Sequence, residues 1–206
     1  MLDAHVFVVF MLGALALNLT PGPDMTFVLA QSAHRGTGAG LEAALGIGAG
    51  TIFHMTLAAF GLAALFAAWP FAFDIVRYAG ALYLLWIGWG MVRYAPGLGA
   101  DAMELARGAA FRQGVLTNVL NPKVVMFFIA FLPQFVVPGA GPTWLQILVL
   151  GIAFDISGTL VNCAVAFGGG RLANRLRTNP RIGAVLGWVS GGVMLGLAVR
   201  LAWPRR

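Results

Sequence analysis

Two proline-containing segments hold most of the polar residues that could bind a ligand. The first reads Asn18-Leu19-Thr20-Pro21-Gly22-Pro23-Asp24 and the second reads Asn118-Val119-Leu120-Asn121-Pro122-Lys123. Proline has no N–H, and its ring collides with the carbonyl four residues earlier, so both segments should break a helix. The carbonyls of Leu17, Leu19 and Asn118 would then lack helical hydrogen bonds. Beyond each break a new helix would begin with exposed N–H groups and partial positive charge, which together suit a carboxylate.

Asp24 and Lys123 directly follow the two breaks. Asp24 fits the first turn of a helix as an acid that satisfies the dipole, and Asn121 fits an N-cap with Pro122 at the first helical position. Lys123 has no such local role, because a cation opposes the dipole at a helix start. We therefore expect Lys123 to have an anionic partner, either Asp24 or the carboxylate of a substrate. A purely structural ion pair is the alternative.

Two further ionisable residues lie inside apolar stretches. Asp155 stands between Phe154 and Ile156, and an acid within a membrane segment is a functional candidate that could carry a proton. His54 could exchange protons with Asp155 near neutral pH. A hydrogen-bonded packing role is the alternative for His54. The expected proton-coupling residues are thus Asp155 and His54.

Other chemistries have weaker support. Ser157 could in principle meet His54 as nucleophile and base, but no glycine-flanked serine elbow accompanies it. Three separated histidines and one cysteine give no metal-ligand spacing, so we expect neither a metal nor a cofactor. A membrane-embedded enzyme is one function that these residues leave open. A subunit that serves only in an assembly is another.

The composition indicates which elements must position these residues. Of 206 residues, 60% are hydrophobic and 10% are charged, and the mean hydropathy is +0.86. Soluble domains carry about 25% charged residues, so an all-α integral membrane protein is expected. The net charge of +6 does not indicate nucleic-acid binding, because most basic residues lie between the apolar stretches.

Six apolar stretches are long enough to span a bilayer as helices. The loops between them are short, so the chain should form one transmembrane domain over residues 1–206. Residues 1–5 contain no Lys or Arg, so we expect no cleaved signal peptide. The predicted spans are 4–33, 41–68, 71–92, 110–137, 144–170 and 181–203.

The basic residues predict the orientation. They concentrate in the first, third and fifth loops, which should therefore be cytoplasmic, with both termini outside. The C-terminal pair Arg205-Arg206 argues the other way. The basic residues of the odd loops are Arg35; Arg93, Arg107 and Arg112; and Arg171, Arg175, Arg177 and Arg181.

The two halves of the chain are related in sequence. A shift of 101 residues aligns six identical residues between residues 13–27 and 114–128, around the two proline segments, and places His54 on Asp155. Each half, about 1–100 and 101–206, would contain three helices, an odd number, so the second must cross the membrane inverted. Rocking of one repeat against the other would supply alternating access. Glycine pairs such as Gly46 with Gly50 and Gly187 with Gly191 should let helices pack closely.

At the residues quoted above the sequence resembles the LysE/RhtB family of bacterial amino-acid exporters. The resemblance covers nearly the whole chain and is most specific over residues 18–24 and 121–135. It implies a secondary transporter of the inner membrane that exports amino acids, such as threonine, homoserine, leucine or basic ones, by proton antiport. The substrate would bind at Asn18, Pro21, Gly22, Pro23, Asp24, Asn121, Pro122 and Lys123.

The resemblance leaves several points open. The wider superfamily is similar to metal exporters and thiol carriers, so export of a metal ion or another small solute is an alternative. The expected partners are an amino acid, protons and the lipid bilayer, without nucleic acid. Whether the chain forms a homo-oligomer is open.

Overall fold

The computed structural model describes residues 4–69 and 109–178, with single positions between 71 and 89 and between 184 and 199. The regular structure of these parts is helical, without strands, which confirms the all-α fold class. Two helices are long and apolar enough to cross a membrane, and two bent helix pairs pass the same test as pairs. They correspond to the first, second, fourth and fifth predicted spans. The other two predicted spans, 71–92 and 181–203, lie largely outside the described residues.

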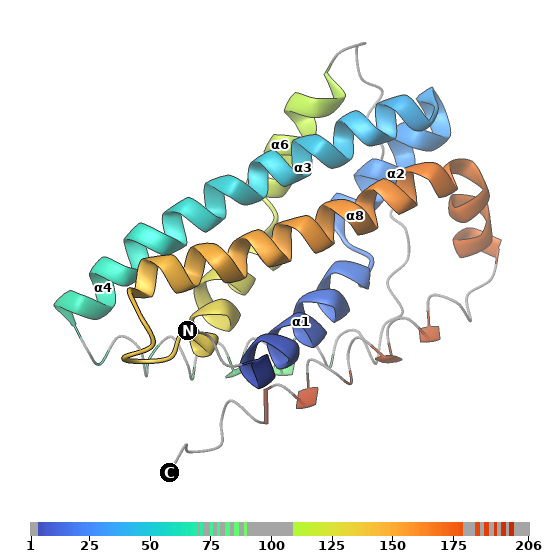
Figure 1. Cartoon of the computed structure of the whole chain (residues 1–206). Helices are drawn as coiled ribbons and strands as arrows, with labels where there is room; N and C mark the ends of the chain where they lie inside the picture. Colours follow the sequence, from blue (N-terminus) through green and yellow to red (C-terminus); the bar gives the residue numbers. More distant parts are fainter. Residues whose placement is uncertain are drawn as a thin grey trace.

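The first predicted span is a broken helix. α1 (Ala4–Leu19) and α2 (Pro23–Arg35) are bent by 48° at the break between them (Figure 1). Pro21 lies in the break and Pro23 begins α2, as expected for residues that lack an N–H. Asp24 lies in the first turn of α2 and is buried. The break and the local role of Asp24 are therefore confirmed.

The fourth predicted span is broken in the same way. α6 (Ala110–Val119) is followed by α7 (Pro122–Met126), the π-helix η2 (Phe127–Phe131) and the 3-10 helix η3 (Leu132–Phe135). The bend is again 48°. Asn121 caps α7 by accepting a hydrogen bond from the backbone N–H of Lys123 at 3.0 Å, and Pro122 is at the first helical position, as predicted. The inverted relation of the two halves stays a prediction.

Two long helices pack side by side and also pack against the broken helices (Figure 1). The first comprises α3 (Thr37–Leu57), the π-helix η1 (Ala58–Leu62) and α4 (Ala63–Ala68). The second is α8 (Thr143–Thr178). Gly169 departs from helical geometry inside α8, with a φ of 40° that favours glycine. The apolar part of α8 ends there, within one residue of the predicted boundary.

Glycines bring α3 and α6 into backbone contact. A Cβ atom added to Gly46 would overlap the carbonyl oxygen of Phe111, and one added to Gly114 would lie 2.5 Å from the carbonyl oxygen of Ala43. Gly50 likewise leaves room for Asn118. This confirms the predicted close packing at Gly46 and Gly50. The pair Gly187 and Gly191 lies outside the described residues.

We expect Gly46→Ala to destabilise the protein strongly. The added methyl group meets backbone atoms, which cannot turn away as a side chain can, so the cost should be at least about 1–3 kcal/mol. Gly38→Ala is the matched control in the same helix, because its Cβ would meet nothing within 4 Å. Thermal unfolding of both variants in detergent measures the difference. Equal melting temperatures would contradict the tight contact.

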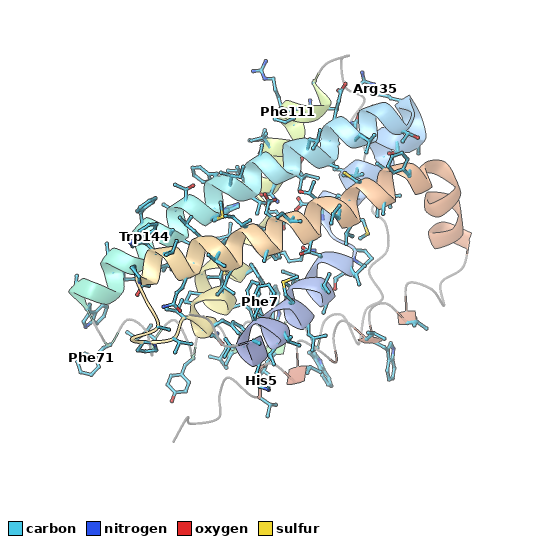
Figure 2. The ribbon with its side chains drawn as sticks, in the orientation of Figure 1. His5, Phe7, Arg35, Phe71, Phe111 and Trp144 are labelled. Carbon is cyan, nitrogen blue, oxygen red and sulfur yellow. The ribbon has the colours of Figure 1, made fainter. Side chains whose placement is uncertain are left out.

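The two ends of the bundle differ in their residues. Arg35 lies at the same end as Phe111, whereas Trp144 and Phe71 lie at the opposite end (Figure 2). The location of Arg35 agrees with a common end for the odd loops. Which end faces the cytoplasm stays a prediction.

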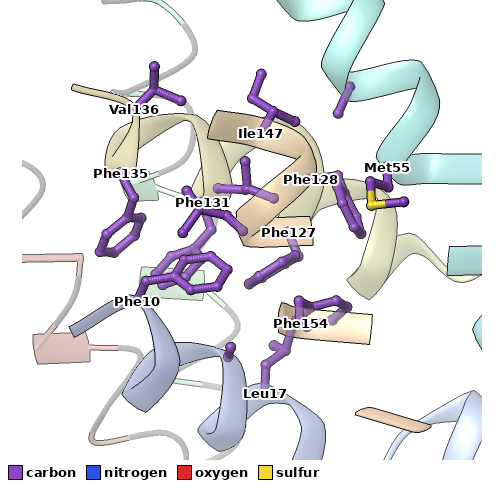
Figure 3. Close-up of a cluster of buried hydrophobic side chains, with 14 of the residues drawn as sticks. Phe10, Leu17, Met55, Phe127, Phe128, Phe131, Phe135, Val136, Ile147 and Phe154 are labelled. Carbon is purple, nitrogen blue, oxygen red and sulfur yellow. The ribbon is translucent and has the colours of Figure 1, made fainter. Parts of the chain in front are cut away.

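A cluster of aromatic side chains fills the core between α1, α8 and the segment that follows α7 (Figure 3). Phe127 stacks on Phe154, with 4.0 Å between ring centroids, and Phe10 contacts Phe127 at 5.9 Å. Phe131 contacts both Phe10 and Phe127, and Phe135 contacts Phe10 and Phe131. Phe154 also lines the central cavity described below, so this apolar cluster closes one side of it.

Candidate functional site

The two helix breaks and the middle of α8 enclose a cavity of about 30 Å³. Four predicted site residues line it, namely Asn18, Asp24, Lys123 and Asp155, whereas the others lie outside its lining. A water molecule requires about 10–15 Å³ by this kind of measure, so the cavity has room for about two. The remaining lining residues are Thr20, Met25, Ile47, Thr51, Asn118, Val124, Phe154, Gly158, Thr159 and Asn162.

The ammonium group of Lys123 lies at the C-terminal end of α1. It donates hydrogen bonds to the carbonyl oxygens of Leu17 at 3.2 Å and Thr20 at 3.1 Å. Pro21 deprives the Leu17 carbonyl of its donor four residues later, although the backbone N–H of Thr20 donates to it at 3.2 Å. A cation is favourable at the negative end of a helix dipole. Lys123 belongs to the first turn of α7, where a cation is unfavourable, but its ammonium group lies at the C-terminal end of α1, where a cation is favourable.

The side chain of Asp24 is hydrogen-bonded to the second break. Its Oδ2 accepts a hydrogen bond from Asn118 Nδ2 at 2.9 Å. Its Oδ1 is buried and forms no hydrogen bond to another described residue. No direct contact between Asp24 and the Lys123 ammonium is found among the described residues, where backbone carbonyls hold the ammonium. The two charged groups still interact electrostatically, so Asp24 as the anionic partner of Lys123 stays a prediction.

Asn118 links the second break to α3. Its Oδ1 accepts a hydrogen bond from Thr51 Oγ1 at 3.4 Å, and its backbone carbonyl lies 3.1 Å from His54 Nε2. A carbonyl can only accept, so His54 Nε2 must carry the hydrogen. Pro122 deprives this carbonyl of its donor four residues later, although the backbone N–H of Asn121 donates to it at 2.9 Å. A side chain from another helix thus donates to a carbonyl at each break. Lys123 donates at the first break and His54 donates at the second.

His54 and Asp155 do not meet at the cavity. The His54 ring packs on Phe128, with ring centroids 6.1 Å apart, and is absent from the cavity lining. Asp155 lines the cavity and accepts a hydrogen bond from Thr159 Oγ1 at 3.5 Å. Its carboxylate faces Gly48 of α3, where a Cβ would lie 3.4 Å from Oδ1. His54 therefore connects to the cavity through Asn118.

Asn18 ties the first break to α8. Its Nδ2 donates to Ser157 Oγ at 3.0 Å and to the Phe154 carbonyl at 3.3 Å. Ser157 Oγ in turn donates to the Phe154 carbonyl at 2.9 Å. Ser157 and His54 thus have separate partners, and the nucleophile and base of the enzyme alternative are not paired here.

Some cavity side chains were missed by reasoning from the sequence. They are those of Thr51, Asn118 and Thr159, all polar residues of membrane helices. Helical spacing offered a signal, because Thr51 precedes His54 by one turn and Thr159 follows Asp155 by one turn. In the described ranges no group of three His, Cys, Asp or Glu side chains could hold a metal ion.

Comparison with known proteins identifies the family. Residues 15–204 match the family model described as LysE type translocator. The chain is 36% identical to an uncharacterised membrane protein of Pseudomonas aeruginosa over 95% of its length and 94% of that protein. It is 32% identical to the leucine efflux protein of Salmonella typhimurium, over 94% and 92% of the two chains.

A leucine efflux protein of Enterobacter sp. (strain 638) is 30% identical, over 95% of this chain and 94% of the relative. No solved structure matches the chain. The family match covers both helix breaks and all the cavity residues. The chain therefore belongs to the LysE-type translocator family.

Proposed function

We propose that the protein is a secondary transporter that exports neutral aliphatic amino acids, of which leucine is the first candidate, across the bacterial inner membrane by proton antiport. The observation that carries this proposal is the cavity at the two helix breaks, which combines a cation and two acids with an apolar wall. Similarity to the two leucine efflux proteins supports leucine over basic amino acids.

The charged groups of the cavity suit a zwitterion. Lys123 and the start of α2 at Gly22 and Pro23 offer positive charge to a carboxylate. The carbonyls at the end of α1 and the carboxylate of Asp24 offer negative charge to an ammonium group. Discontinuous helices that present such ends near mid-membrane are the usual substrate sites of secondary transporters.

The apolar part of the cavity suits an aliphatic side chain. Met25, Ile47, Val124 and Phe154 contribute it from four different helices. A basic side chain placed against these residues would lose its hydration without gaining a charged partner there, which disfavours it. The cavity of about 30 Å³ must widen to admit any amino acid, so binding and helix movement are expected to be coupled.

Asp155 is the proposed carrier of the proton. It lines the same cavity as the substrate groups, so its charge and that of the substrate interact directly. Protonation on the outer side and release on the inner side would drive export. His54 donates a hydrogen bond to the backbone carbonyl of Asn118, and the side chain of Asn118 donates to Asp24. His54 is thereby linked to Asp24 through Asn118.

Export of labelled amino acids from proteoliposomes tests the function. We expect leucine and similar aliphatic amino acids to leave when a pH gradient is imposed, and arginine and lysine to stay. Liposomes with the gradient collapsed by an ionophore are the control. Folded protein that moves none of the amino acids under either condition would overturn the proposal. Gradient-dependent movement of basic amino acids alone would overturn the aliphatic assignment.

A further inference from the structure

The hydrogen bonds of Lys123 raise a question about how a substrate binds. A lysine side chain ends in a primary ammonium group, which has the same chemistry as the α-ammonium of an amino acid. That ammonium occupies the two carbonyl oxygens of Leu17 and Thr20 at the end of α1. These carbonyls are also the acceptors best suited to the ammonium of a substrate, because a helix end adds partial negative charge.

The fit of the lysine at this position is close. A Cβ atom added to Gly22 would lie 3.1 Å from Lys123 Nζ and 3.4 Å from its Cε. The ammonium therefore lies between the end of α1 and Gly22, the N-cap of α2, at the edge of the cavity. A second ammonium cannot bind the same two carbonyls while Lys123 stays there.

Two acceptors are available to Lys123 once it leaves. Asp24 Oδ1 is buried without a hydrogen bond to another described residue and lines the same cavity as Lys123. The carboxylate of a bound amino acid is the second acceptor. The flexible four-carbon stem of lysine lets its head group exchange partners without backbone movement.

We propose that Lys123 is a tethered competitor for the substrate ammonium. It fills the carbonyl site of Leu17 and Thr20 when no amino acid is bound, and the substrate ammonium displaces it. The displaced Lys123 then binds the substrate carboxylate. This inference rests on the proposed function, since it assigns the two charged ends of the amino acid to defined groups of that cavity.

This exchange explains how one site keeps a cation through a transport cycle. The Leu17 carbonyl also accepts a hydrogen bond from the backbone N–H of Thr20 at 3.2 Å, so Lys123 adds a charged donor at the negative end of α1 and is not its sole donor. Lys123 supplies this positive charge whenever the substrate is absent. It also favours ligands that carry both charges, because a simple amine displaces Lys123 without giving it a new carboxylate.

Binding of two half-ligands of leucine to the purified full-length protein tests the inference. The probes are 3-methylbutylamine, which has only the ammonium group, and 4-methylpentanoate, which has only the carboxylate. In Lys123→Met the carbonyl site has no competitor. We expect the amine to bind about tenfold tighter than to the wild type, and the acid to bind about tenfold weaker.

Arg112→Met is the matched control, because it removes a cation from an exposed position of α6 outside the cavity lining. It should change neither affinity. Lys123→Gln is the second variant in case Lys123→Met does not fold, since its amide can still donate to the carbonyls. It should shift both affinities in the same directions by smaller factors.

An unchanged or weaker affinity of Lys123→Met or Lys123→Gln for the amine would overturn the inference. Binding of L-leucine to the wild type separates this result from failure of the proposed function. If the wild type binds leucine but the variants bind the amine no more tightly, the proposed function stands and the competitor role of Lys123 is wrong. If the variants bind the amine more tightly but the wild type does not bind leucine, the competitor role stands and leucine is not the substrate.

Discussion

Asp155→Asn should abolish the response of amino-acid export to a pH gradient. Asparagine has nearly the same size and can still accept a hydrogen bond from Thr159 Oγ1, which lies 3.5 Å from the carboxylate. It cannot take up a proton, so a cycle driven by protonation at this position stops. We expect gradient-driven efflux of leucine from proteoliposomes to fall to the level of liposomes without protein.

Thr159→Val is the control for this experiment. It removes the long hydrogen bond to Asp155 but leaves the carboxylate able to titrate, so coupling to the gradient should persist. Export by Asp155→Asn that still increases with the imposed gradient would contradict the role of this residue and place coupling elsewhere. Melting temperatures of both variants show whether the fold is intact.

Asn118→Leu should cost the protein both stability and leucine binding. The asparagine is 1% exposed and donates to Asp24 Oδ2 at 2.9 Å, which is its shortest side-chain hydrogen bond. Leucine is similar in size but leaves both carboxylate oxygens of Asp24 without a hydrogen bond. An unsatisfied buried polar group costs about 1–3 kcal/mol, and a charged one costs more. We expect a clear fall in melting temperature and loss of leucine binding.

Thr51→Val provides the comparison for Asn118→Leu. It removes the 3.4 Å hydrogen bond from Thr51 Oγ1 to Asn118 and the 3.1 Å bond to the Ile47 carbonyl of the same helix, and it conserves the shape of the side chain. Because the bond to Asn118 is long and the Ile47 bond lies within one helical turn, the effect on stability should be small. Similar losses in Asn118→Leu and Thr51→Val would show that Asp24 does not depend on Asn118. Both variants are compared by thermal unfolding and by leucine binding in the same detergent.

The helix breaks were predictable from the sequence because their cause is local. Pro21, Pro23 and Pro122 lack an N–H wherever they occur, so the ends of α1 and α6 follow from chain chemistry alone. The N-cap role of Asn121 follows for the same reason. The apolar length of the spans was likewise enough to locate four of them.

Side-chain partners were not predictable in the same way. The sequence shows that Lys123 needs negative charge, but backbone carbonyls of Leu17 and Thr20 and the carboxylate of Asp24 all supply it. Which of these acceptors Lys123 contacts depends on the depth in the membrane at which α1 and α7 meet. The sequence patterns of the two helices do not specify this depth. His54 illustrates the same limit, because its partner is a carbonyl on another helix.

The glycine contact between α3 and α6 constrains how the protein can move. Gly46 belongs to the first predicted repeat and Gly114 to the second, and their backbones touch. A motion that slid one whole half past the other would separate this contact, so we expect α3 and α6 to move together as one rigid body. Alternating access would then arise at the non-helical residues between α1 and α2 and between α6 and α7, which would act as hinges for the short half-helices.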